Sequence, residues 1–207
     1  MSTAQFFAHG SRQRRSWRLL RRFGRNRRGA TVVEFGLIAM PLFAIICGVF
    51  EIAYANIENE ILANAVSDAA RAMMTGNTQG SNITTAQQFI STYLCQAGTT
   101  RTLPSSFNCD NLIVDVRPAS NFAAGDTTNN FYNSSSNQFC PGQPGAIMVM
   151  RVAYPLPAIL PINLFSRTAG IVSDVPNHLG TKYHILLGAE LFMEEQYSGS
   201  YTPPTGC

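Results

Sequence analysis

A single carboxylate near the start of an otherwise uncharged apolar stretch constrains this chain more than any other feature. Between Phe35 and Phe50 the 207-residue sequence contains no charged side chain. With Ala30–Val33 added, the stretch approaches the ~20 residues that a helix needs to cross a bilayer. Glu34 interrupts it, and inserting a carboxylate into lipid costs roughly 2.5–3.5 kcal/mol. The sequence therefore predicts a membrane-spanning helix whose carboxylate has a partner.

Positive charge is concentrated before this stretch. Nine of the fifteen Lys and Arg residues precede Gly29, and no acidic residue does. From Ala30 onward six basic side chains face twelve acidic ones, a net charge of −6. By the positive-inside rule, such a cluster holds the N-terminus in the cytoplasm, and this explains the basic residues better than nucleic-acid binding does. Residues 1–29 are thus expected to form a basic cytoplasmic leader, and everything after about Ala55 is expected to lie across the membrane.

Helical periodicity continues beyond the apolar stretch. Apolar residues recur every three or four positions, with polar residues on the opposite face, until Gly76-Asn77 gives a stop signal. A helix from Ala30 to Thr75 would be about 69 Å long, of which lipid requires only ~30 Å. We expect a transmembrane half over 30–55 and an amphipathic extension over 56–76. The expected apolar face consists of Ile57, Ile61, Leu62, Ala65, Val66, Ala69 and Met73. The expected polar face consists of Glu58, Asn64, Ser67, Asp68 and Arg71.

The remaining residues, 77–207, are predicted to form an extracytoplasmic domain. Thr84–Gln88 resembles a capping box that opens a short helix, and residues 119–139 have the composition of a long exposed loop. The expected fold class is α+β, a long N-terminal helix with a small, mostly antiparallel sheet packed on its distal half. Strands are expected at Leu112–Val116 (ended by Pro118) and Ala146–Tyr154 (ended by Pro155 and Pro157), and a third strand or strand pair at Tyr183–Met193.

Four cysteines lie outside the apolar stretch and one, Cys47, lies within it. In an oxidising compartment four thiols most often form two disulfides, and three pairings are possible. Loop closure favours Cys95 with Cys109 and Cys140 with Cys207. A zinc site would need closely spaced ligands, and no C-x-x-C pair or neighbouring histidine is present, so no metal is expected.

The segment Arg27-Arg28-Gly29-Ala30, followed by Glu34-Phe35, resembles the processing site of type IV prepilins. It is more similar still to the TadE-like proteins of tight-adherence (Flp) pilus systems, over Arg27 to about Thr75. In prepilins a membrane peptidase cuts on the cytoplasmic face after a small residue. The resemblance therefore implies cleavage between Gly29 and Ala30. The long outer domain, and Phe35 where major Flp pilins favour tyrosine, point to a minor pilin or pseudopilin.

Cleavage at this position would expose the α-amino group of Ala30, which is mostly protonated near neutral pH. Glu34, four residues on and expected in the first helical turn, is placed to pair with that amine within one subunit. The resemblance implies a pair with the amine of an adjacent subunit in a filament. The expected partners are a prepilin peptidase, other pilin subunits, an inner-membrane pilus platform and membrane lipid, with no nucleic acid and no cofactor.

Alternatives remain open. Glu34 could lie at the headgroup level of an uncleaved anchor, or signal peptidase could cut at the A-x-A site Ala53–Ala55 and release a domain starting at Asn56. The chain would then be an exported or membrane-anchored surface-binding module with no filament role, whose contacts could include Phe122, Phe131, Tyr132 and Phe139. Equally, these aromatic residues could pin the loop to the sheet. No nucleophile elbow or phosphate loop is present, so no enzyme is expected.

Overall fold

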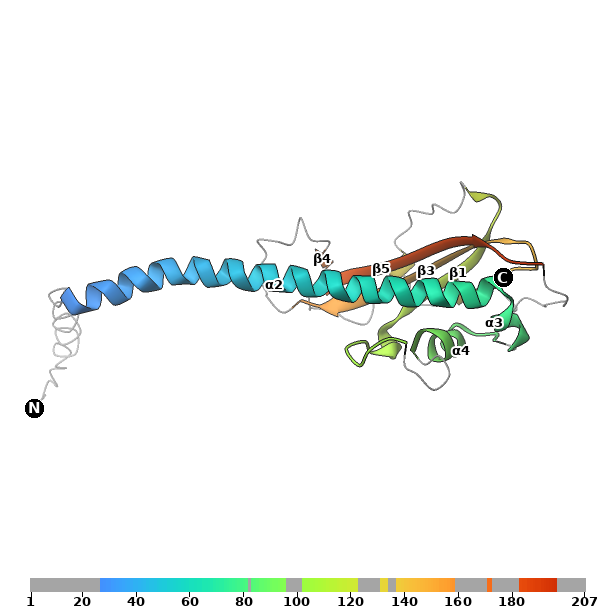
Figure 1. Cartoon of the computed structure of the whole chain (residues 1–207), viewed down its shortest axis with the longest axis horizontal. Helices are drawn as coiled ribbons and strands as arrows, with labels where there is room; N and C mark the ends of the chain where they lie inside the picture. Colours follow the sequence, from blue (N-terminus) through green and yellow to red (C-terminus); the bar gives the residue numbers. More distant parts are fainter. Residues whose placement is uncertain are drawn as a thin grey trace, which may run out of the picture. The chain divides into compact units, whose positions relative to one another are not determined.

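A computed structural model describes residues 27–81, 83–95, 102–122, 131–133, 137–158, 171–172 and 183–196. It divides into two compact units, Met1–Val49 and Phe50–Cys207. The elements follow one another as shown in Figure 1. The helices are α2 (Arg27–Met74), α3 (Asn77–Gly80) and α4 (Ala86–Phe89), with a π-helical turn at Ile90–Cys95 and 3-10 turns at Cys109–Asn111 and Phe131–Asn133. The strands are β1 (Ile113–Ala119), β2 (Gln138–Phe139), β3 (Ile147–Pro157), β4 (Ile171–Val172) and β5 (Tyr183–Met193).

The long helix predicted from the periodicity is present as α2, which is 48 residues long. It ends where the sequence indicated, because Gly76 adopts a φ of 76° and its amide nitrogen donates to the carbonyl of Met73 at 3.0 Å. Few residues other than glycine adopt this left-handed conformation, which closes a helix by bonding back to its last turn. Pro41 lies inside the helix, in the unit before Phe50.

The strands form one five-stranded sheet in the order β2-β1-β3-β5-β4. Among the described strands only the β1–β2 pair is parallel, so the predicted α+β fold with a mostly antiparallel sheet is confirmed. From Phe50 onward, α2 lies along one face of this sheet (Figure 1). The core between them is apolar, and its helix residues include Leu62, Ala65, Val66, Ala69 and Met73.

One glycine sets how closely helix and sheet approach. A Cβ atom added at Gly188 of β5 would lie 2.8 Å from a methyl carbon of Val66 on α2. Real Cβ atoms do not approach other carbons this closely, so any larger side chain would push the helix away from the strand. Gly188 is therefore a packing residue of the helix–sheet interface.

Three prolines lie inside strands that they were expected to end. Pro118 pairs with Met148, while Pro155 and Pro157 pair with Ile185 and Tyr183. The prediction was wrong because these prolines lie where a strand has a described neighbour on one side only. Strand β2 pairs only with residues 115 and 116 of β1, and β1 reaches only to residue 153 of β3. A proline without N–H is tolerated at such edge positions.

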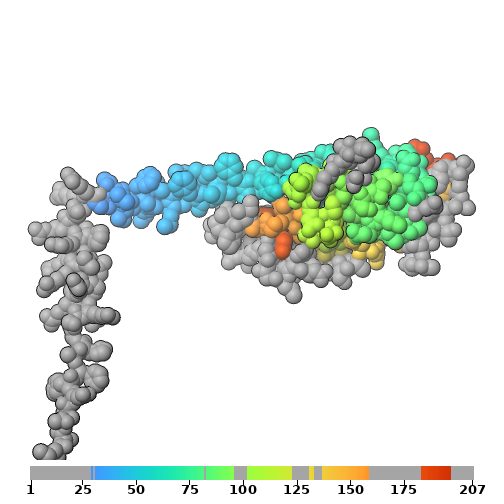
Figure 2. Space-filling model, turned by 90° about the horizontal axis from the view of Figure 1, so that it is seen from below, coloured from blue at the N-terminus to red at the C-terminus, as the bar shows by residue number. Residues whose placement is uncertain are grey.

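The segment between α2 and β1 packs beside the second half of α2, as Figure 2 shows for residues 77–95 and 102–112 in green to yellow-green. The capping box is present around α4, with the amide of Gln88 donating to the Thr85 hydroxyl at 3.3 Å. The side-chain oxygen of Gln88 in turn accepts from the amide of Thr84 at 3.1 Å. The helix then continues as the π-helical turn Ile90–Cys95, which ends at Cys95.

Residues 119–139 are not wholly an exposed loop. Phe139 belongs to β2, is buried and stacks against Phe89 of α4 with ring centroids 5.1 Å apart. The Phe131 ring lies 4.7 Å below the Arg151 guanidinium and next to Tyr132, whereas Phe122 is exposed. For Phe131, Tyr132 and Phe139, these contacts favour the interpretation that the aromatic residues hold the segment against the sheet over the interpretation that they form a binding surface. Residues 123–130 and 134–136 lie outside the described part.

Candidate processing and assembly site

Gly29 is the third residue of α2, so the Gly29–Ala30 peptide bond lies in the first turn of the described helix. Gly29 is exposed, and a Cβ atom added to it would meet no atom within 4 Å. Packing within the described chain therefore does not require glycine here. The side chains of Arg27, Arg28 and Ala30 lie outside the described part of the structure.

Glu34 is the eighth residue of α2 and is exposed. In the uncleaved chain α2 already includes Arg27 and its first turn has no acidic residue, so the expected position of Glu34 in the first turn after Ala30 stays a prediction for the cleaved chain. Among the described residues, no side chain pairs with the Glu34 carboxylate. The structure therefore shows the carboxylate of the predicted charge pair but, among the described residues, no partner for it.

The helix surface that follows Glu34 is apolar. Exposed large apolar residues flank Glu34 and extend to the end of the first unit: Val32, Val33, Phe35, Leu37, Ile38, Met40, Leu42, Phe43, Ile45, Ile46 and Val49. Within the described chain, α2 is one helix that is long and apolar enough to cross a membrane. Water disfavours a continuous apolar surface of this kind, so it requires lipid or other helices around it.

Sequence reasoning missed two polar contacts in the domain, and the first joins Glu51 of α2 to His184 of β5. His184 Nε2 lies 3.1 Å from Glu51 Oε1, and the side chains are only 7% and 11% exposed. Glu58, expected on the exposed polar face, is buried instead and accepts from the Ser106 hydroxyl at 3.2 Å. Ile57, expected on the buried face, is 59% exposed. The expected faces therefore fail only at Ile57 and Glu58: farther along α2, Leu62 and Met73 are buried and Asp68 is exposed, as expected.

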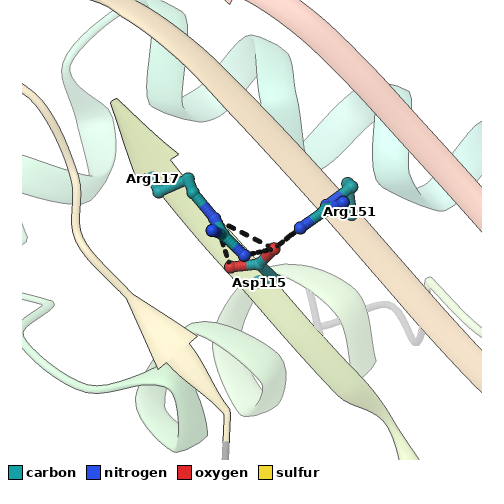
Figure 3. Close-up of polar contacts among 3 residues, drawn as sticks. All are labelled: Asp115, Arg117 and Arg151. Atoms are coloured by element: carbon teal, nitrogen blue, oxygen red, sulfur yellow. Dashed lines mark hydrogen bonds and ion pairs between the residues drawn. The ribbon is translucent and has the colours of Figure 1, made fainter. Parts of the chain in front are cut away.

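The second missed contact is a charge cluster on the sheet (Figure 3). Asp115 of β1 lies directly opposite Arg151 of β3 and accepts from its Nε at 3.0 Å and from its terminal Nη2. Arg117 also donates to Asp115, with Nη2 2.6 Å from Oδ2. Asp115 and Arg151 are buried, and the Arg151 guanidinium stacks on Phe131. The signal was the spacing of Asp115 and Arg117 among apolar residues in β1 and the single charge of Arg151 within the apolar strand β3.

This cluster has the geometry of a structural ion pair, not of a reactive centre. The single carboxylate is taken up by two guanidinium groups, and removing one member would leave an uncompensated buried charge. Among the residues that the structure describes, no group of three or more His, Cys, Asp or Glu side chains could hold a metal ion.

Cys95 and Cys109 form a disulfide with Cα atoms 6.3 Å apart, which ties the π-helical turn to the segment before β1. Cys140 is also disulfide-bonded, and Cys207, the partner expected for it, lies outside the described residues. Among the described cysteines, Cys47 of the apolar segment is free and exposed.

The comparison with protein families gives one result that bears on this site. Residues 29–71 match the family model described as TadE-like protein, so the match begins at Gly29 and ends within α2. No curated protein and no solved structure matches the chain significantly. The matched family implies a part in a tight-adherence pilus system, and its members are generally not enzymes. Over the helix that carries Gly29, Glu34 and the apolar surface, the chain is similar to the TadE-like proteins, as the sequence motif indicated.

Proposed function

We propose that this chain is a minor pilin or pseudopilin of a tight-adherence pilus. It is made as a single-pass inner-membrane precursor with a cytoplasmic N-terminus and a periplasmic domain. A prepilin peptidase cleaves it between Gly29 and Ala30. The mature chain then joins or starts a filament together with other pilin subunits and the membrane platform.

The observation that carries the proposal is the family match, whose first residue is Gly29. The family model thus includes the glycine, the carboxylate five residues later and the apolar surface, and it excludes the basic leader. The absence of any packing reason for glycine at position 29 points the same way. A small residue is what a peptidase that cuts after it would select.

Cleavage changes the electrostatics of the helix end. It removes nine positive charges and leaves one new ammonium group on Ala30. In the low dielectric of the membrane an unpaired carboxylate at Glu34 is costly, and an ammonium group within reach relieves that cost. A neighbouring subunit offers its ammonium group at one axial offset only. The pair therefore sets the register of assembly as well as contributing to its free energy.

The same helix weighs against release by signal peptidase. The A-x-A site Ala53–Ala55 lies inside α2, not in an extended segment. A cut before Asn56 would also remove most of the residues that match the family, 29–71. The proposal therefore keeps the helix in the mature protein.

Processing is tested with two glycine variants of the full chain, expressed with and without the prepilin peptidase. Gly29→Leu should remain at precursor size on a gel, because the larger side chain blocks the cleavage position. Gly36→Leu is the matched control, since added atoms there would also meet nothing within 4 Å. It should be shortened like the wild type. Normal shortening of Gly29→Leu would refute the proposed cut site.

Assembly is tested with two carboxylate variants. Glu34 and Glu60 are both exposed on α2, so Glu34→Gln and Glu60→Gln make the same chemical change at matched positions. Glu34→Gln should reduce pilus yield while insertion and cleavage persist, and Glu60→Gln should not. Wild-type pilus yield from Glu34→Gln would show that the charge pair has no role.

A further inference from the structure

The charged residues of α2 are arranged around a long gap. Glu34 and Glu60 are exposed, and between them the helix has only two charged side chains, Glu51 and Glu58. Both of these face the domain and are covered by it. The outward surface of α2 therefore carries no exposed charge over 25 residues, from Phe35 to Asn59.

The uncharged polar groups in this gap are also satisfied by the protein itself where α2 passes the domain. The side-chain amide of Asn56, although exposed, donates to the helix carbonyl of Ile52 at 2.8 Å. Asn59 accepts from the backbone amide of Leu187 at 3.0 Å. In water such groups need no internal partner, whereas in lipid each unsatisfied one costs several kcal/mol.

The apolar surface also continues past Glu51. Phe50, Ile52 and Ile57 are all exposed, and Ile57 is 59% exposed. Beyond Glu60 the exposed positions become polar, as at Asn64, Asp68 and Arg71. The outward face therefore changes from apolar to polar at Glu60. This is nine residues after Glu51, the first charged residue that follows Phe35 in the sequence.

The lengths agree with this boundary. A span from Ala30 to Phe50 is about 32 Å long, which crosses only the ~30 Å hydrocarbon core. Ala30–Asn59 is about 45 Å long, which also covers the headgroup regions of a bilayer ~40–45 Å thick.

We propose that the outer leaflet of the membrane reaches Glu60, so that the end of the domain holding His184, Ser106 and Leu187 sits in the lipid headgroup region. The inference rests on the membrane anchoring in the proposed function. Lipid is the occupant of the exposed Ile52–Ile57 face because that face continues the apolar span without a break and completes its length. His184 then covers a carboxylate, Glu51, that would otherwise face the boundary between the headgroups and the hydrocarbon.

Fluorescence quenching by brominated lipid tests the boundary. In the full chain, reconstituted into phosphatidylcholine vesicles, the native Trp17 is replaced by phenylalanine and one tryptophan is introduced at a time. The three sites are Met40→Trp in the apolar span, Ile57→Trp at the proposed extension and Asn64→Trp beyond it; all three positions are exposed on α2. Because none is buried in the domain core, these variants test location and not folding.

Brominated acyl chains should quench Met40→Trp strongly and Ile57→Trp more weakly but clearly, because Ile57 lies near the headgroups, while Asn64→Trp should be quenched by iodide in the water. If Met40→Trp is quenched and Ile57→Trp responds only to iodide, the boundary lies before Ile57 and the inference is wrong while the anchor stands. If Ile57→Trp responds to neither quencher, protein covers this face and the lipid assignment is overturned. If Met40→Trp escapes brominated lipid, the membrane anchor itself fails.

Discussion

The two halves of α2 share one helical backbone but differ in how far their apolar side chains are exposed. Between Phe35 and Phe50 every large apolar side chain is exposed. Between Glu51 and Met74 one face is buried against the sheet, with Leu62 and Met73 fully covered. The comparison teaches that helical periodicity alone does not say what a helix buries. An all-round apolar helix needs lipid or other helices, while an amphipathic one needs its own domain.

The largest expected difference between the halves comes from a matched pair of leucines. Leu62→Ala should lower the free energy of unfolding of the domain by about 2–5 kcal/mol, because it leaves a cavity where the side chain is 0% exposed. Leu42→Ala, where the side chain is 52% exposed, should change it by less than about 0.5 kcal/mol. Urea denaturation of the full chain in detergent micelles, followed by near-UV circular dichroism, measures both. Equal losses would show that the two halves do not differ in packing.

The cysteines also differ between the two parts: Cys95 and Cys109 of the domain form a disulfide, whereas Cys47 of the apolar half of α2 is free. Replacing Cys95 and Cys109 together by serine should cost about 3 kcal/mol, the value for a loop of ~15 residues, because the unfolded domain gains freedom. Cys47→Ser should leave domain stability unchanged, since that thiol is free and exposed. The same urea titration, with and without reductant, measures the effect. A wild-type protein whose midpoint is insensitive to reductant would contradict this prediction.

The close approach of the second half to the sheet predicts a smaller loss. Gly188→Ala should destabilise the domain by about 1–3 kcal/mol, because the new methyl group would overlap Val66. Val66→Ala in the same chain should recover part of the loss by making room. Gly80→Ala is the control, since a Cβ atom there meets nothing within 4 Å. If the double variant is no more stable than Gly188→Ala alone, the contact does not limit the packing.

The smallest effect concerns a single polar link between helix and strand. Asn59→Ala removes the acceptor of the Leu187 amide and should cost about 0.5–1.5 kcal/mol. Asn64→Ala changes an exposed residue of the same helix and should have almost no effect. Hydrogen exchange of the Leu187 amide measures the link directly. Unchanged protection of that amide in Asn59→Ala would contradict the assignment.

Much of the fold could be predicted from local patterns. The spacing of apolar residues placed the long helix within three residues of its described start, and Gly76 marked its end. The bounds of β5 were predicted from the pattern over Tyr183–Met193, which left one strand or a strand pair open, and the structure has one strand. The predicted ends of β1 and β3 were wrong because prolines were expected to end them. Whether a strand has one neighbour or two at a proline depends on the whole sheet.

The contacts between distant segments could not be predicted in this way. Nothing near Glu51 in the sequence points to His184, which lies 133 residues away. Asp115 and Arg151 meet only because β1 and β3 pair in one register. The faces of the second helix half were assigned by average periodicity, and the buried Glu58 and exposed Ile57 show that partners decide which face is covered. By contrast, Gly29 and Glu34 could be found because their spacing is a local motif.

The most direct measurement is the mass of the mature N-terminal peptide from membranes of cells that contain the prepilin peptidase. The account predicts a chain that begins at Ala30, with its free amine four residues before Glu34. A chain that retains Met1, or one that starts at Asn56, would lack that amine and would contradict the account.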